Sequence, residues 1–184
     1  MREVKEPEVR KQELMDCAMK LFAEKGYEST TISDIAKEQH VATGLCYHYF
    51  HSKKELYEEA LKSYITLCTE DIIELFSKKL PLAVMEQEFY VAQKLIEQKS
   101  KYSDFFDRNK DFHIQLEEGM AEALTLPLAS YLEALNDRQE ANIADPYFTA
   151  SFILHGGMFL FRQEEGQRTA DLKKMWDMIQ KLIL

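Results

Sequence analysis

The chain has 184 residues, 46% of them hydrophobic and 30% charged, with a formal net charge of −9. This composition excludes a disordered chain and fits a globular protein with one sizeable core or two smaller ones. No apolar run approaches the roughly 18 residues of a membrane-spanning helix, and the charged start of the chain lacks the apolar segment of a signal peptide. Only six Gly and four Pro are present, so the sequence predicts an all-α protein.

The cysteine content predicts a reducing environment. Cys17, Cys46 and Cys68 do not have the spacing of metal ligands, and three thiols cannot all pair with one another. We therefore expect reduced cysteines, no metal, no cofactor and a cytoplasmic location.

The negative charge is unevenly distributed. Residues 1–62 contain 10 basic and 12 acidic side chains, whereas residues 63–184 contain 13 and 20. No Asp or Glu occurs between Gln39 and Lys54, a window that includes Lys53 and three histidines. A local surface without carboxylates can meet phosphate groups even in an anionic protein, so this window is a candidate for contact with nucleic acid.

Four helices are predicted in the N-terminal part, over about residues 8–25, from 31 onward, 42–49 and 52–79. Apolar residues recur three and four positions apart in the first, and Gly26 is its expected C-cap. Thr31 and Asp34 have the spacing of a capping box, and so do Ser52 and Glu55. A short capped helix, a tight break and a second short helix form the order of a helix-turn-helix, whose second helix enters the DNA major groove.

Five further helices are predicted, over about residues 82–99, 102–110, 111–136, 146–163 and 169–183. Pro81 ends the fourth helix. Pro127 lies inside the seventh, so a kink or break is expected there. Pro146 suits the first turn of the eighth. The chain is thus expected to contain about nine helices and no strand.

The N-terminal third resembles the TetR family of bacterial transcriptional regulators. The matching residues are Leu21–Glu28, Thr30, Thr31, Asp34–Ala36, Val41, Gly44, Tyr47, Phe50, Ser52, Lys53 and Leu56. The resemblance implies a homodimeric repressor whose three-helix domain, residues 1–52, reads a palindromic operator. It also implies a helical domain, residues 53–184, that binds an effector and dimerises through the last two helices.

Three departures from the family pattern lie in the turn and in the reading helix. Gln39-His40 replaces the usual Ala-Gly, and histidine tolerates a positive φ less well than glycine. Leu45 stands where a hydroxyl that touches phosphate is common, and Thr43 where a lysine is common. We expect these changes to alter the preferred operator and its affinity without removing the architecture.

The predicted DNA-binding residues lie on the reading helix or at the starts of its neighbours: Thr31, Ala42, Thr43, Gly44, Leu45, Tyr47, His48 and Lys53. Gly44 lets the backbone approach the duplex, and Tyr47 and His48 offer polar tips on rigid rings. Lys53 and the free N–H groups of its helix would clamp a phosphate. Simple packing of Tyr47 and a solvated Lys53 are the alternatives. One of Leu45 and Cys46 is expected to be buried, and the other could meet a thymine methyl.

The C-terminal part contains two further candidate sites. Residues expected near an apolar effector pocket are Tyr64, Phe89, Tyr102, Phe105, Phe106, Phe112, His113 and Met120, although an ordinary helical core would contain the same residue types. Residues expected at the dimer interface are Phe148, Phe152, His155, Gly156, Met158, Phe159, Met175 and Ile179. No basic cluster accompanies the aromatic set, so a largely apolar effector is favoured.

An enzyme is not expected. The motif His155-Gly156-Gly157 resembles the oxyanion loop of some esterases, but the chain has no Gly-x-Ser-x-Gly nucleophile turn. Close helix approach at the two glycines is the better interpretation. The sequence therefore predicts a DNA-binding regulator, acting as a ligand-responsive repressor on operator DNA. The alternative is a regulator controlled by a protein partner instead of a small molecule.

Overall fold

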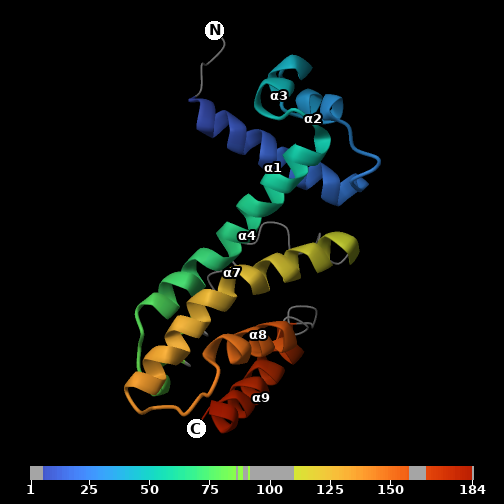
Figure 1. Cartoon of the computed structure of the whole chain (residues 1–184). Coiled ribbons are helices and arrows are strands. Elements are labelled where there is room, and N and C mark those ends of the chain that lie inside the picture. The colour runs from blue at the N-terminus through green and yellow to red at the C-terminus, as the bar shows by residue number, and fades with distance from the viewer. Residues whose placement is uncertain (1–5, 86, 89–90, 92–109, 158–164, 184) are drawn as a thin grey trace. The chain divides into compact units, whose positions relative to one another are not determined.

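The computed structural model describes residues 6–85, 87–88, 91, 110–157 and 165–183. Its helices are α1 (Pro7–Lys25), α2 (Ile32–Glu38), α3 (Thr43–Tyr49), α4 (Lys53–Ser77), α7 (Lys110–Asp137), α8 (Pro146–Gly157) and α9 (Glu165–Ile183). All regular structure in these segments is helical (Figure 1), which confirms the all-α class. The helix predicted over 102–110, and most of the one over 82–99, fall outside the described segments.

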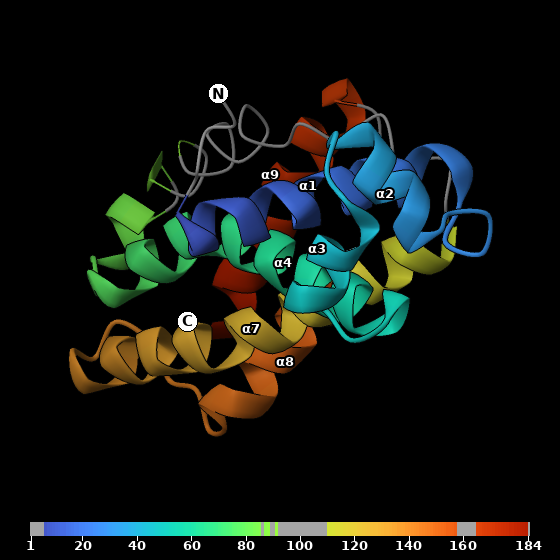
Figure 2. The same ribbon diagram turned by 90° about the horizontal axis from the view of Figure 1, so that it is seen from above.

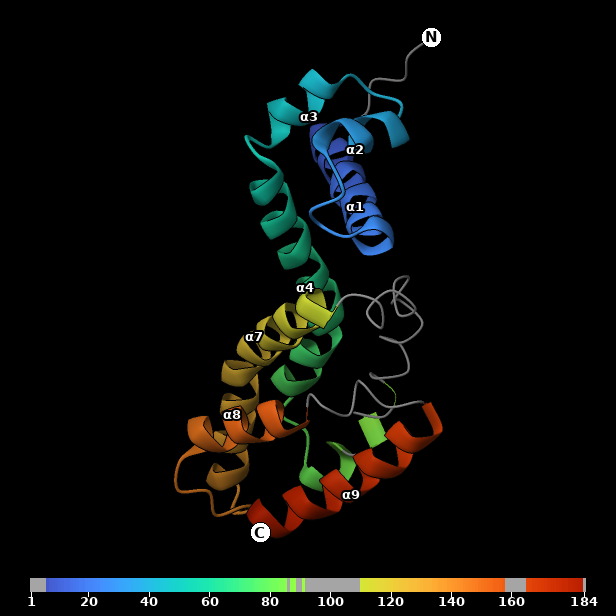
Figure 3. The same cartoon turned by 90° about the vertical axis from the view of Figure 1, so that its right-hand side faces the viewer.

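The chain divides into two compact units. One contains Met1–Tyr64 and Tyr102–His113, and the other contains Ile65–Lys101 and Ile114–Leu184. In the first unit, α1 contacts α2, and α2 contacts α3 (Figures 2 and 3). Its core is formed by buried apolar side chains, among them Leu14, Ala18, Leu21, Phe22, Ile32, Ile35, Cys46, Phe50, Leu56 and Ala60. A compact three-helix head thus packs on the first turns of α4.

Local capping fixes the ends of the first two helices. The Gly26 N–H donates to the Phe22 carbonyl at 2.9 Å, with the glycine at φ 88°, so the expected C-cap is confirmed. The Thr31 hydroxyl accepts from the Asp34 N–H at 3.1 Å, and the Asp34 carboxylate accepts from the Thr31 N–H at 2.9 Å. This pair confirms the predicted capping box.

The turn between α2 and α3 places a non-glycine residue in the left-handed region. His40 has a φ of 54°. Its N–H donates to the Lys37 carbonyl at 3.1 Å, and the Val41 N–H donates to the Ala36 carbonyl at 2.9 Å. These two bonds form a Schellman motif, in which the residue at the His40 position is most often glycine. The strain expected from the Gln39-His40 substitution is therefore present.

Replacing His40 with glycine is expected to stabilise the protein by about 1 kcal/mol, because glycine adopts positive φ without a steric penalty. Urea denaturation monitored by circular dichroism would measure the change. His51→Gly is a matched control, because His51 is also exposed but has no positive φ. A loss of stability in His40→Gly would show that the imidazole makes a contact worth more than the strain.

In the second unit, α7 runs through Pro127 without ending, so of the predicted kink or break, the break does not occur. Proline removes a helical hydrogen bond, at a cost of about 3 kcal/mol in a helix interior. Leu124 and Leu128, on either side of it, are both buried. The free energy gained by burying these two side chains offsets the cost of the proline and keeps the helix continuous.

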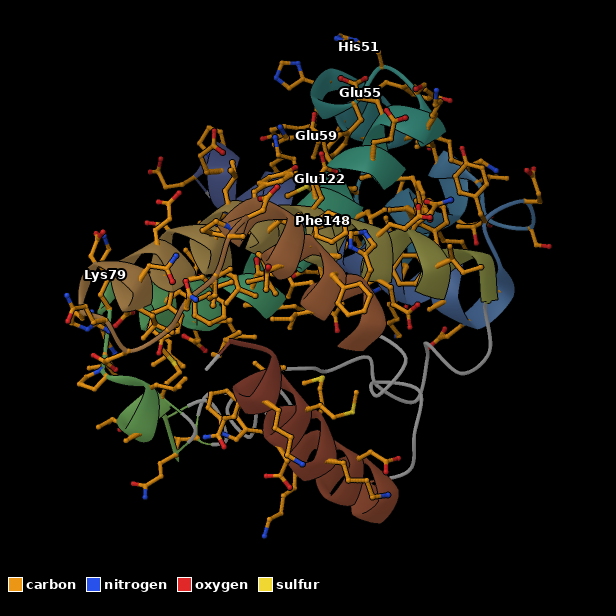
Figure 4. All side chains as sticks on the ribbon, turned by 60° about the horizontal axis from the view of Figure 1, so that its bottom comes forward. His51, Glu55, Glu59, Lys79, Glu122 and Phe148 are labelled. Carbon is orange, nitrogen blue, oxygen red and sulfur yellow. The ribbon has the colours of Figure 1, made fainter. Side chains whose placement is uncertain are left out.

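The loop after α7 makes hydrogen bonds to the segment that follows the C-terminus of α4. The Arg138 guanidinium donates to the carbonyls of Lys79 and Leu80 at 3.0 and 3.1 Å. The Glu140 carboxylate accepts from the Leu82 N–H at 2.9 Å, and this bond, with the Arg138 side chain, lowers the pKa of Glu140. Figure 4 labels Lys79 at this end of the unit.

Of the helices described, none has both the length and the apolar character required to cross a bilayer.

Candidate DNA-binding surface

One face of α3 packs into the core of the head, and the other is exposed to solvent. Cys46, in α3, and Phe50, directly after it, are fully buried, so Cys46 is the buried member of the Leu45–Cys46 pair and Leu45 is half-buried. Ala42, Gly44, Tyr47 and His48 are exposed, with Tyr47 at 52%. The structure thus brings the predicted reading-helix residues together at the surface of the head, beside α2 (Figure 3).

Gly44 is not required by packing within the head. A Cβ added at this position would meet no atom within 4 Å, and its φ is not positive. Neither helix packing nor backbone strain therefore explains the glycine at the second position of α3. Close approach by another molecule would explain it.

Thr31 is one of the two predicted DNA-binding residues at the starts of the helices beside α3. Its hydroxyl donates to the Asp34 carboxylate at 2.6 Å, and the bonds from Thr31 hold the pKa of Asp34 below its usual range. The hydroxyl and the N–H of Thr31 are thus both used by the capping box. A phosphate contact by either group would have to compete with the Asp34 carboxylate.

Lys53 is also engaged inside the head. Its ammonium donates to the Tyr27 carbonyl at 2.9 Å and lies 4.2 Å from the centroid of the Tyr27 ring. An ammonium group has three N–H donors, but the Glu28 carboxylate also lies 4.0 Å from the Lys53 nitrogen, so a phosphate would have to compete with it. The contact with Tyr27 holds the charge in a defined place, which sequence reasoning did not anticipate.

The predicted Ser52–Glu55 capping box places a carboxylate at the start of α4, and it differs from the expected pattern in one bond. The Ser52 hydroxyl accepts from the Glu55 N–H at 3.0 Å, as the predicted capping box requires. The Glu55 carboxylate, however, accepts from the His51 N–H at 2.6 Å (Figure 4). A negative charge beside this helix N-terminus weakens its attraction for phosphate. The sequence predicted that Glu55 folds back over the helix start, and the structure shows its bond at the N–H of His51, one residue before Ser52.

The residues predicted around an effector pocket are only partly described. Tyr64, Phe112 and Met120 are buried, and the Phe112 ring contacts the Tyr57 ring at a centroid distance of 6.2 Å. The predicted residues Phe89, Tyr102, Phe105 and Phe106, and the side chain of His113, lie outside the described part of the chain. None of the three described side chains lines the apolar cavity found in the second unit.

The predicted dimer-interface residues on α8 lie at the surface. Phe148 and Phe152 are one helical turn apart and 67% and 64% exposed, and Figure 4 labels Phe148 on α8. His155 and Gly156 are exposed too. Met175 and Ile179 line the cavity, and Met158 and Phe159 fall outside the described residues. Three further apolar side chains with more than half of their surface exposed lie in the second unit: Leu126, Tyr147 and Met178.

The two glycines at the end of α8 differ. A Cβ on Gly157 would lie 3.0 Å from the Met175 sulfur, whereas one on Gly156 would meet nothing within 4 Å in the described structure. Close helix approach is therefore confirmed at Gly157 and not found at Gly156. The His155 Nδ1 lies 2.8 Å from the Ser151 carbonyl oxygen, one turn earlier.

A short, outward-facing helix joined by a tight turn to a capped helix, within a three-helix head, defines the helix-turn-helix class of DNA-binding protein. Residues 14–60 match the family described as bacterial regulatory proteins, tetR family. This match lies in the head and covers about a quarter of the chain, so the head is similar to the DNA-binding domain of TetR-family transcriptional regulators.

Two curated relatives match this chain over short segments. A Staphylococcus aureus protein, the biofilm operon icaADBC HTH-type negative transcriptional regulator IcaR, is 44% identical over 52 residues, which are 28% of each chain. The HTH-type transcriptional repressor KstR2 of Mycolicibacterium smegmatis is 37% identical over 60 residues, 33% of this chain and 29% of the relative. The matches thus span less than a third of the length of these relatives.

Solved structures match over almost the whole chain. A putative TetR-family transcriptional regulator from Mesorhizobium loti aligns with a TM-score of 0.70 at 19% identity, covering 97% of this chain and 99% of that one. A regulator of the TetR/AcrR family from Thermobifida fusca aligns with a TM-score of 0.65 at 15% identity, covering 94% and 97%. At these identities the likeness concerns the fold.

Proposed function

We propose that this protein is a ligand-responsive transcriptional repressor that binds a palindromic operator as a homodimer. The observation that carries the proposal is the exposed face of α3, with Gly44, Tyr47 and His48 open to solvent and Cys46 anchoring the opposite side. The two relatives above are named as a negative regulator and a repressor. In this proposal, residues 1–52 read DNA and residues 53–184 bind the effector and dimerise.

The exposed aromatic side chains of α8 support the dimer. Phe148 and Phe152 share one face of the helix, and Tyr147 beside them is 58% exposed. Large exposed apolar patches on a soluble protein mark interaction surfaces. A twofold dimer uses the same patch on both copies, and it would place two α3 helices in successive major grooves, about 34 Å apart.

Helix α4 would couple the two activities. Its residues up to Tyr64 belong to the first compact unit, and the rest belongs to the second. An effector that binds one arrangement of the second unit more tightly would change the position of α4 and so the spacing of the two heads. Operator affinity would then change by the ratio of effector affinities for the two arrangements.

Selection of genomic fragments by the full-length protein tests the proposal. An enriched inverted repeat, bound by a dimer, is the expected result. Enrichment of no duplex sequence, at any salt concentration that keeps the protein folded, would contradict it. If an operator is found but no metabolite changes its affinity, control by a protein partner would replace control by a small molecule.

The affinity for the selected operator is expected to depend strongly on salt. If each head contacts two or three phosphates, the logarithm of the binding constant should fall with the logarithm of salt concentration with a slope of about −4 to −5. Fluorescence anisotropy between about 50 and 200 mM salt would measure it. A slope near zero would mean that the acid-free window does not meet the DNA backbone.

A further inference from the structure

The side chains of α3 lack the charged and amide groups that proteins commonly use to read base edges. The segment from Ala42 to Phe50, which contains α3 and its two caps, has no Arg, Lys, Asn, Gln, Asp or Glu. Direct readout commonly uses bidentate bonds from Arg or Lys to guanine and from Asn or Gln to adenine, or an acidic side chain that accepts from cytosine. Recognition by α3 therefore depends on single hydrogen bonds and on apolar contacts.

Two long polar side chains close to α3 in the sequence are placed for other contacts. Gln39, the nearest amide in the sequence, caps α2, is half-buried and interacts with the buried Cys17 thiol. Lys37 is exposed, but it lies on α2, the helix that crosses the phosphate backbone in this motif. A phosphate contact fixes the register of the protein on the duplex and carries no direct sequence information.

Leu45 lies at the edge of the exposed face of α3. Cys46 is fully buried and marks the inner side of the helix. With about 100° of rotation per residue, Gly44 and His48 lie opposite Cys46. Leu45 is then on one flank of the exposed face and Tyr47 on the other. Leu45 is half-buried, and the neighbouring Gly44 has no side chain to cover it, so part of the Leu45 surface is accessible from the exposed face.

Ala42 extends this apolar edge by one turn. It is exposed, and its carbonyl accepts from the Leu45 N–H at 2.9 Å, so the two residues are three positions apart on one side of α3. Neither side chain can donate or accept a hydrogen bond. The apolar group that the major groove offers is the C5 methyl group of thymine, and proteins contact it with apolar side chains.

We propose that Leu45, with Ala42 beside it, reads the C5 methyl group of thymine, so that each operator half-site presents a thymine to this edge of α3. Leu45 is thus a specificity-determining residue. This readout rests on the proposed function, because it requires α3 to enter the major groove of an operator.

Deoxyuridine isolates the methyl group, because it pairs with adenine as thymidine does and lacks only that group. Operator duplexes selected by the full-length protein would carry deoxyuridine at one thymine position at a time, in both half-sites together. At the position that faces Leu45, wild-type protein is expected to bind the deoxyuridine duplex about 15-fold more weakly, that is about fourfold for each of the two methyl contacts of a dimer. Fluorescence anisotropy would measure both affinities.

Leu45→Ala shortens the side chain that contacts the methyl group in this proposal. In this variant the ratio of the two affinities should fall from about 15 to about three or less. Both duplexes are measured with the same preparation, so any unfolded fraction cancels in the ratio. Leu67→Ala is the matched control, because it makes the same truncation at an exposed leucine of the second unit. It should keep the full ratio.

Two results would overturn the proposal while the operator is still bound and the proposed function stands. One is equal affinity of wild-type protein for the thymine and deoxyuridine duplexes at every half-site position. The other is an unchanged ratio in Leu45→Ala, which would assign the methyl contact to another residue. If the full-length protein selects no operator, the proposed function fails, and this readout fails with it.

Discussion

Tyr47→Ala is expected to lower the affinity for the selected operator by about 30-fold or more. A side-chain contact to a base edge contributes roughly 1–3 kcal/mol, and a dimer loses two such contacts. The fold should not change, because Tyr47 is half exposed and surface substitutions usually change stability by less than about 0.5 kcal/mol. Fluorescence anisotropy with the operator would measure affinity, and thermal denaturation would measure stability.

Two control variants make this result specific. Val9→Ala truncates a side chain of α1 with the same exposed fraction, 52%, and should leave operator affinity unchanged. Tyr47→Phe retains the ring and separates contacts of the ring from those of the hydroxyl. Unchanged affinity in Tyr47→Ala would mean that α3 is not the reading helix.

Phe152→Asp is expected to convert the dimer into a monomer at micromolar concentration. Burying an unpaired carboxylate in an apolar interface costs several kcal/mol, and the twofold axis doubles the cost. A monomer binds through one head and loses the added affinity of binding through two. Operator affinity should therefore fall by a factor of about 10² to 10⁴. Sedimentation equilibrium would give the oligomeric state, and anisotropy would give the affinity.

Val84→Asp is the matched control for this charge. Val84 belongs to the same compact unit and is 41% exposed, but it lies on the segment after α4 and not on α8. This variant should remain dimeric. Should Phe152→Asp also remain dimeric and bind the operator normally, the exposed face of α8 would have another role.

The head was predictable because its determinants are local. The Thr31–Asp34 capping box, the Gly26 cap and the strained His40 turn each depend on residues within six positions of one another. Such signals remain readable in a sequence because short-range hydrogen bonds fix them. The exposed face of α3 followed from the same local pattern.

The features that were missed depend on distant residues. Lys53 turns toward the Tyr27 carbonyl, 26 positions away, and no periodicity encodes that direction. At Pro127, where a kink or a break was predicted, α7 continues, and Leu124 and Leu128 are buried beside the proline. The apolar cavity of the second unit is lined by residues from α4, α7, α8 and α9, so only tertiary packing reveals it.

Dimethyl sulfate footprinting of the operator complex tests most directly whether α3 enters the duplex. This reagent methylates guanine N7, which lies in the major groove, and adenine N3, which lies in the minor groove. Wild-type protein should protect guanine N7 in two patches about one helical turn apart, and Tyr47→Ala should lose protection within them. Protection confined to adenine N3, or N7 protection unaffected by the substitution, would contradict the reading role of the Gly44–His48 face.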